Sequence, residues 1–171
     1  MQILERFQQD IHSAANWSAQ EAALLRAILH FGYDRYLFEM IPSIERNALN
    51  DYICVSNTSE RWQKEYLDRG HLNVDNAVRH CLEHDSPALW SELHASAAPG
   101  KEMEVIELAS DYGYTVGVTI PLWLQWNPFR FGLSLIVEGS VDFSSHDENF
   151  LKNRAELLAI SRVFLSYADI R

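Results

Sequence analysis

The spacing of apolar residues predicts helices at the start of the chain, followed by strands. Ile3–Ala15 has the pattern of a helix, and Ser18 with Glu21 forms a capping box that predicts a second helix through His30. The runs Tyr33–Ile41 and Tyr52–Ser56 are dense in aromatic and branched residues, which is typical of strands. We therefore expect two helices and then two paired strands.

The middle of the chain has the start and stop signals of short helices. Capping residues at 57–59 precede a helix predicted over Glu60–Arg69, and Asp75 is placed to cap another helix through His84. A loop that contains Trp90 follows and ends at Gly100. Apolar residues at positions 103, 106, 109 and 112 then mark one face of a further helix, which we expect to end at Gly113.

The last third of the chain predicts two strands and a long helix. Tyr114–Leu124 is almost entirely apolar, and apolar and polar residues alternate over 129–138, as expected for a strand with two different faces. Ser145 and Glu148 form a capping box before an apolar helical stripe that reaches Ala168. The predicted fold is one α/β (α+β) domain over residues 1–171. We expect an α-β-α sandwich with a mainly antiparallel sheet of about five strands and helices on both faces.

Composition narrows the class of protein. The chain has 171 residues and a formal net charge of −10, so this stretch should repel nucleic acid. It has no apolar run long enough to cross a membrane and no export signal, and its two cysteines lie in apolar segments. We therefore expect a cytoplasmic protein without membrane contact or disulfide bonds.

Several polar and aromatic residues are candidates for a ligand pocket. Trp62 and Tyr66 lie four residues apart and share one helix face, where they could form a pocket wall or simply pack the helix on the sheet. Asp75 could accept a hydrogen bond from a ligand amide, although an ordinary helix cap is the simpler interpretation. Trp90 allows the same two interpretations, a pocket wall or simple packing. Thr119 and Ser134, on the last two strands, could point into a cavity or bond nearby backbone.

The sequence motifs give little support for a catalytic site or a metal site. His80, Cys81 and His84 have helical spacing, but the order of residues does not match H-E-x-x-H and no further ligand is marked. The chain has no G-x-S-x-G elbow and no phosphate-binding glycine loop. We expect no enzyme activity, no metal and no cofactor other than a bound signal.

The ordered set Trp62, Tyr66, Asp75, Trp90 and Gly117 resembles the autoinducer-binding domain of LuxR-family quorum-sensing transcription regulators, most closely the LasR-like branch. The resemblance covers nearly the whole chain. It includes Val74-Asp75-x2-Val78-x-His80-Cys81, Gly117-x-Thr119-x-Pro121-Leu122 and Leu133-Ser134-Leu135. It implies a GAF/PAS-like fold and a buried small acylated signal, N-acyl-homoserine lactone being the expected one.

The resemblance also implies roles for individual residues. The Trp62 indole would donate to the lactone carbonyl, Asp75 would accept the amide N–H, and Tyr66 would lie along the acyl chain. Trp90 would wall the lactone, and Thr119 and Ser134 would contact the polar head or the amide carbonyl. The cavity would be completed by Leu37, Val78, Cys81 and Gly132.

Three positions depart from the family pattern. Asn76 stands where a proline is usual, which should loosen the backbone that presents Asp75. Thr58 stands where many members have a tyrosine that bonds the amide carbonyl. Glu39 replaces a small residue that faces the pocket, and we expect an ion pair with Arg35 or Arg130, or a contact with the ligand.

The resemblance further implies partners. The long C-terminal helix should support a homodimer, and DNA would be bound only through a helix-turn-helix domain that this chain does not contain. Two rival hypotheses stay open: an interaction protein that pairs with a full-length regulator, and a zinc lactone hydrolase that would lose activity on chelation. A receptor for a non-lactone signal is a further alternative.

Overall fold

The computed structural model describes residues 2–42, 51–125, 127–139 and 141–168. Five strands form one sheet in the order β2-β1-β5-β4-β3, and every pair of neighbours is antiparallel. The strands are β1 (Arg35–Ile41), β2 (Ile53–Ser56), β3 (Ala88–Leu89), β4 (Val116–Trp123) and β5 (Arg130–Val137). The predicted antiparallel sheet is confirmed.

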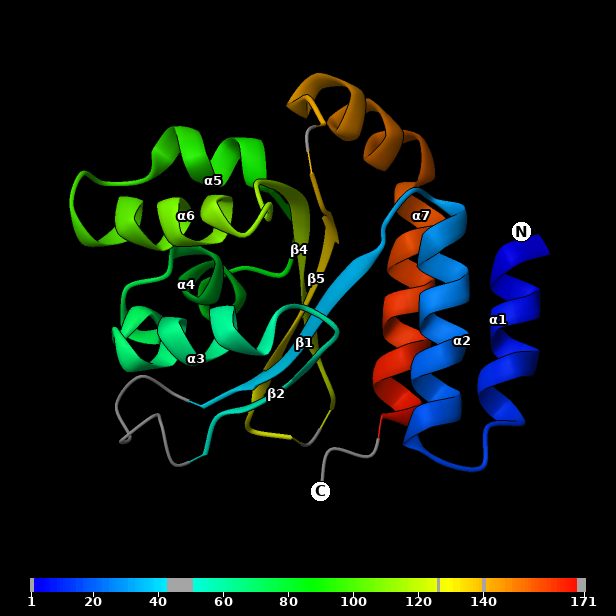
Figure 1. Ribbon diagram of the computed structural model, residues 1–171. Helices are drawn as coiled ribbons and strands as arrows, with labels where there is room; N and C mark the ends of the chain where they lie inside the picture. Colours follow the sequence, from blue (N-terminus) through cyan, green and yellow to red (C-terminus); the bar gives the residue numbers. More distant parts are fainter. Residues whose placement is uncertain (1, 43–50, 126, 140, 169–171) are drawn as a thin grey trace.

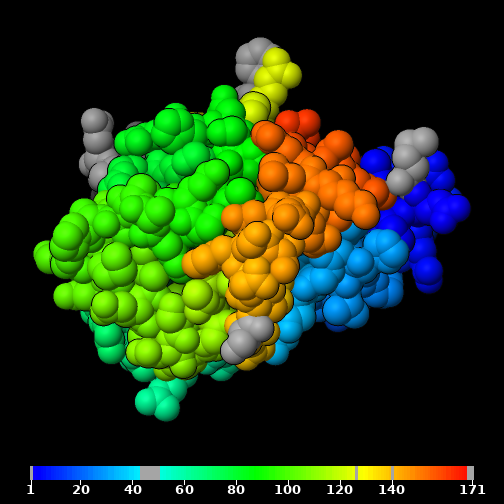
Figure 2. Space-filling model, turned by 90° about the horizontal axis from the view of Figure 1, so that it is seen from above, coloured from blue at the N-terminus to red at the C-terminus, as the bar shows by residue number. Residues whose placement is uncertain are grey.

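Helices cover both faces of this sheet (Figure 1). One face packs against α2 (Trp17–His30) and α7 (Phe143–Tyr167), and α1 (Gln2–His12) packs on the outer side of these two helices. The other face is covered by α3 (Glu60–Asp68), α4 (Asn76–Glu83), α5 (Trp90–Ser96) and α6 (Lys101–Asp111), with the short 3-10 helix η2 (His71–Asn73) between α3 and α4. Seen from above, the green side chains of the α4–α6 region adjoin the orange side chains of α7, with the blue N-terminal helices beyond them (Figure 2).

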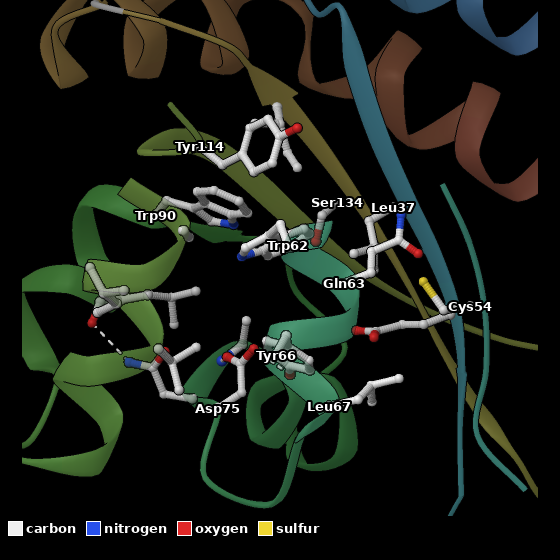
Figure 3. A pocket seen from close by; sticks show the side chains of 18 of the residues that line it. Leu37, Cys54, Trp62, Gln63, Tyr66, Leu67, Asp75, Trp90, Tyr114 and Ser134 are labelled. Carbon is white, nitrogen blue, oxygen red and sulfur yellow. Dashed lines mark hydrogen bonds between the residues drawn. The ribbon is translucent and has the colours of Figure 1, made fainter. Parts of the chain in front are cut away.

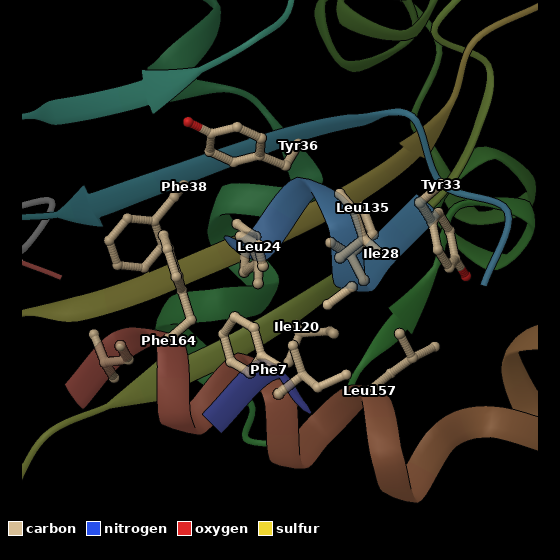
Figure 4. Close-up of a cluster of buried hydrophobic side chains, with 14 of the residues drawn as sticks. Phe7, Leu24, Ile28, Tyr33, Tyr36, Phe38, Ile120, Leu135, Leu157 and Phe164 are labelled. Carbon is tan, nitrogen blue, oxygen red and sulfur yellow. The ribbon is translucent and has the colours of Figure 1, made fainter. Parts of the chain in front are cut away.

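The two faces of the sheet bury two separate clusters of side chains. Phe38, Ile120 and Leu135 point toward α1, α2 and α7, where they meet Leu24 and Phe164 (Figure 4). The second cluster lies under α3 to α6 and includes the following residues: Ile41, Trp62, Tyr66, Val78, Cys81, Val105, Leu108, Tyr114 and Ile136. The first layer is an apolar core, whereas the second also surrounds a cavity.

Two predicted helix starts were wrong. The α2 cap is Asn16, whose side chain accepts from the Ala19 N–H, and the α7 cap is Asp142, which accepts from the Ser145 N–H. Each helix therefore begins earlier than the capping boxes at Ser18 and Ser145 suggest. In both cases a local cap residue just before the expected serine starts the helix, and the earlier start of α2 also brings Trp17 against Phe164, with ring centroids 5.9 Å apart.

The segment around Trp90 is more ordered than the sequence indicates. We expected a loop, but Ala88 and Leu89 pair with β4 as a short edge strand, and Trp90 begins α5. Both elements are too short to leave a clear periodicity in the sequence. Pairing with β4 fixes the position of Trp90 beside the sheet.

No helix among the described residues is long and apolar enough to cross a membrane.

Exposed apolar residues on α7 include Leu151, whose exposed fraction is 59%. Dimerisation through this helix stays a prediction, and sedimentation that shows only monomer at high concentration would contradict it.

Candidate functional site

A cavity lies between the sheet and α3 to α6. Its empty space, including the part that opens to solvent, is about 820 Å³. Side chains from two layers converge on it (Figure 3). The sheet and its edge contribute Leu37, Glu39, Tyr52, Cys54, Ser134 and Ile136. The helical layer contributes Trp62, Gln63, Tyr66, Leu67, Asp75, Asn76, Ala77, Trp90, Leu93, His94, Val105, Ile106, Ala109 and Tyr114.

Helix α3 presents two aromatic side chains to this cavity. Ser59 caps the helix, and the four-residue spacing places Trp62 and Tyr66 on the same face, with ring centroids 5.9 Å apart. The Trp62 and Tyr114 rings pack edge to face with their centroids 5.2 Å apart. The Tyr114 hydroxyl accepts a hydrogen bond from the Ser59 N–H at 2.8 Å. Tyr114, which the sequence did not single out, thus holds the start of α3 in place.

The indole N–H of Trp62 is buried and has no hydrogen-bond partner among the described residues. The side chain is only 6% exposed, so bulk water does not reach most of it. A buried donor without a partner costs about 1 to 3 kcal/mol. Because Trp62 lines the cavity, a carbonyl oxygen on a ligand can supply the missing acceptor.

Asp75 is both a helix cap and part of the cavity wall. Its Oδ1 accepts from the Ala77 N–H at 2.8 Å, and its Oδ2 accepts from the Tyr66 hydroxyl at 2.8 Å. Burial raises the pKa of Asp75, and the hydrogen bonds from Tyr66 and from the start of α4 offset part of that rise. The two roles that the sequence left as alternatives therefore coexist at one carboxylate, which can also accept from a ligand.

Asn76 does more than the sequence suggested. We expected the absence of a proline to loosen the backbone at Asp75. The Asn76 side chain is buried, and its amide donates to the Leu93 carbonyl at 2.8 Å, which ties the start of α4 to α5. This bond restrains the same backbone by a different contact.

Trp90 is held by a chain of hydroxyl groups. Its indole N–H donates to Thr119 Oγ1 at 2.9 Å, and that oxygen lies 2.8 Å from Ser134 Oγ. Trp90 and Ser134 line the cavity, whereas Thr119 is fully buried behind them. Thr119 therefore orients Trp90 from behind. It does not line the cavity, whereas the resemblance implied that it would contact the ligand.

Four other predicted residues do not line the main cavity. Thr58 is buried and bonds Ser56 Oγ at 2.6 Å, and Val78 lines a smaller hollow that shares Asp75 with the cavity. Cys81 and Gly132 lie directly behind Glu39, since a Cβ on Gly132 would be 3.0 Å from the Cys81 sulfur and 3.3 Å from Glu39 Oε1. Of the twelve predicted residues, seven reach the cavity: Leu37, Glu39, Trp62, Tyr66, Asp75, Trp90 and Ser134.

Glu39 faces the cavity as strand alternation predicts, but the expected ion pair was wrong. Arg35 pairs with Glu138 at 2.6 Å, and Arg130 bonds the Cys81 and His84 carbonyls and Asp85. The hydroxyl of Tyr52 donates to Glu39 Oε2 at 2.6 Å instead. Burial, with a smaller contribution from Asp75, raises the pKa of Glu39 to about 7 although the Tyr52 bond lowers it.

Ionisation of Glu39 should make the unliganded protein less stable as pH rises. The folded state keeps the Glu39 proton up to a pKa of about 7, whereas the ordinary value is 4.5, so stability falls between these two values. The difference corresponds to about 3 kcal/mol. The titratable groups coupled to Glu39 are Tyr52, Cys54, Tyr66, Asp75 and Cys81.

Urea unfolding at about pH 5 and about pH 8 measures this effect in the parent protein and in Glu39→Gln. The loss of unfolding free energy at the higher pH should shrink by about 3 kcal/mol in the variant. Equal pH dependence in both proteins would show that Glu39 ionises as it does in the unfolded chain.

The sequence missed most of the cavity wall, including Tyr52, Cys54, Gln63 and Tyr114. Tyr52, just before β2, and Cys54, on β2, have period-two spacing and could have been assigned to the face that Glu39 shares. Gln63 and Tyr114 carry no such signal.

The metal hypothesis finds no support in the described residues, where no group of three potential ligands gathers. The His80 and His84 rings stack with centroids 4.7 Å apart, and His80 Nε2 contacts the Ser86 carbonyl at 2.7 Å. These contacts account for both histidines without a metal.

The fold and the cavity define a small-molecule-binding α-β-α domain, and comparison with known proteins gives the family. Residues 18–167 match the Autoinducer binding domain. The chain is 30% identical to the transcriptional activator AnoR of Acinetobacter nosocomialis over 120 residues, 67% of this chain and 48% of AnoR. It is 28% identical to LuxR of Aliivibrio fischeri over 138 residues, 80% of this chain and 50% of LuxR. The chain thus spans about half the length of these activators.

Solved structures share the fold. One of them is CepR2 of Burkholderia cenocepacia, an N-acylhomoserine lactone dependent LuxR-family transcription factor. It superposes with a TM-score of 0.76 at 17% sequence identity, and the match covers 97% of this chain and 93% of the CepR2 chain. SdiA in complex with octanoyl-rac-glycerol superposes with a TM-score of 0.75 at 14% sequence identity, and the match covers 96% of this chain and 64% of the SdiA chain. The chain belongs to the LuxR-type autoinducer-binding domains. Its placement in the LasR-like branch stays a prediction.

Proposed function

We propose that this domain binds an N-acyl-homoserine lactone in the cavity and that binding stabilises its fold. The observation that carries the proposal is the buried, unpartnered indole N–H of Trp62 in the same cavity wall as the Asp75 carboxylate. An acylated amide has the complementary groups, a carbonyl that accepts and an N–H that donates. The apolar side chains of Leu37, Val105 and Ile136 suit an acyl chain.

The names of the relatives support a role of this activity in gene regulation. AnoR and LuxR are transcriptional activators, so we infer that the domain controls a transcription regulator of this family and works in the cytoplasm. The solved SdiA complex contains an acylglycerol, which has hydroxyl donors and no amide. Because hydroxyls can also donate to Asp75, an acylglycerol is the competing ligand class that an experiment must include.

Thermal unfolding with homoserine lactones of several chain lengths, and with octanoyl-rac-glycerol, tests the proposal. A ligand that binds only the folded state at a hundredfold excess over Kd adds about 2.7 kcal/mol and raises Tm. Trp62→Phe keeps the ring but removes the donor, so it should weaken lactone binding by about tenfold or more.

Trp17→Phe is the matched control, because Trp17 lies on α2 and packs against Phe164 on the other face of the sheet. It should leave the ligand-induced rise in Tm unchanged. Melting curves that no lactone shifts would contradict the proposal, and a shift with octanoyl-rac-glycerol alone would assign the other ligand class.

A further inference from the structure

Glu39 occupies a niche built to hold a carboxyl group beside the cavity. On β1 it lies between Cys54 of β2 and Gly132 of β5, its partners in the sheet. Gly132 has no side chain, and a Cβ there would press on both Cys81 and Glu39. The small neighbours leave the Glu39 side chain room beside the cavity, although it is only 5% exposed.

This carboxyl group has one donor and no cation among the described residues. The Tyr52 hydroxyl donates to Oε2 at 2.6 Å, and no hydrogen bond reaches Oε1 within the described ranges. The two arginines on neighbouring strand positions bind other groups, Arg35 to Glu138 and Arg130 to Asp85 and two carbonyls. One carboxyl oxygen of a buried side chain is therefore available to a ligand.

The cavity as a whole is rich in acceptors and poor in charged donors. Its described wall has two carboxyl groups, Glu39 on the sheet and Asp75 at the start of α4, and contains no lysine or arginine. Burial lowers the pKa of His94, which disfavours the charged imidazolium. A ligand that fills this cavity therefore meets two carboxyl groups, and the ionised form of each needs a donor.

We propose that Glu39 selects a signal whose acyl chain carries a hydroxyl group, with the hydroxyl donating to Glu39 Oε1. This inference rests on the proposed function and names the class of acyl chain. A hydroxyl suits the niche because it is neutral and both donates and accepts, so it can bond Glu39 whether or not the carboxyl is protonated. An ammonium group would have to leave water for a wall that is mostly apolar, and a ketone could bond only the protonated carboxyl, to which it would be the acceptor.

Ligand competition during protein synthesis tests the inference. The protein is expressed with equal amounts of N-octanoyl-homoserine lactone and the same lactone with one hydroxyl, placed in turn at the chain end and at mid-chain. Ligand extracted from the purified protein is then quantified by mass spectrometry. For at least one position the parent protein should retain the hydroxylated form in about tenfold excess or more.

Glu39→Leu should reverse this preference, and Glu39→Gln, whose amide oxygen still accepts, should retain part of it. Glu107→Leu is the control, since Glu107 is exposed on α6 and should leave the preference intact. If the parent protein shows no preference for either hydroxylated lactone, or Glu39→Leu keeps it, the inference is wrong while the proposed function stands. If the parent protein retains no lactone at all, the proposed function itself fails. Should Glu39→Leu not fold, the parent protein decides, and the absence of a preference for either hydroxylated lactone would overturn the inference.

Discussion

Asp75→Asn should abolish most signal binding while leaving the unliganded fold intact. The substitution keeps the size of the side chain and its ability to cap α4, because asparagine is as good a helix cap as aspartate. It replaces Oδ2, the oxygen that accepts from Tyr66, by an amide that donates. The Tyr66 hydroxyl can turn to accept from this amide, whereas a ligand N–H would meet a donor. Losing that bond and stranding a buried N–H costs about 2 kcal/mol or more, which is about thirtyfold in Kd.

The stability of the unliganded variant separates binding from folding. Burial raises the pKa of Asp75, so its ionised form is disfavoured in the fold, and a neutral asparagine should unfold at the same urea concentration or a higher one. The matched control is Asp142→Asn, because Asp142 caps α7 at an exposed position away from the cavity. Calorimetric titration and urea unfolding measure both quantities. Equal loss of binding in the two variants would mean that Asp75 acts only as a cap.

Gly117→Ala should destabilise the domain by about 3 kcal/mol, a large effect for one methyl group. A Cβ at position 117 would lie 2.6 Å from the Leu135 carbonyl oxygen and 3.2 Å from the Trp90 ring. The carbonyl belongs to the neighbouring strand and cannot move without disturbing the pairing of β4 with β5. Ordinarily, replacing a strand glycine by alanine would stabilise by roughly 0.5 to 1 kcal/mol, so a loss isolates the clash.

Gly132→Ala is the control, because Gly132 lies in a paired strand but a Cβ there meets side chains rather than backbone. The side chains of Cys81 and Glu39 can shift, so the cost should be well below that of Gly117→Ala. Urea unfolding followed by tryptophan fluorescence gives both values, and it also reports displacement of Trp90. A Gly117→Ala variant as stable as the parent protein would show that the sheet relaxes around the added methyl group.

The residues of the proposed site differ in whether the sequence alone could predict that they lie together. Trp62 and Tyr66 share a face because an α-helix repeats every 3.6 residues, and this required no knowledge of the fold. Strand alternation placed Leu37 and Glu39 on one face in the same way. The hydroxyl chain from Trp90 through Thr119 to Ser134 could not be predicted, because it depends on the register between β4 and β5.

The sequence by itself determined the order of the elements, the antiparallel sheet and the side of each amphipathic element that faces inward. These properties follow from local periodicity and from capping and turn residues. It also predicted Trp62, Tyr66 and Asp75 as three of the polar residues of the cavity wall.

Only the tertiary structure decided which residues from different elements meet. Glu39 has a tyrosine for a partner because β1 lies between β2 and β5 with a register that brings Tyr52 within reach, and because Arg35 and Arg130 are already bound elsewhere. The tertiary structure likewise decided that Trp17, at the start of α2, packs against Phe164 of α7, because these two residues are far apart in the chain. Periodicity assigns a residue to a face, whereas its partner on that face is set by strand order and register, which are long-range properties.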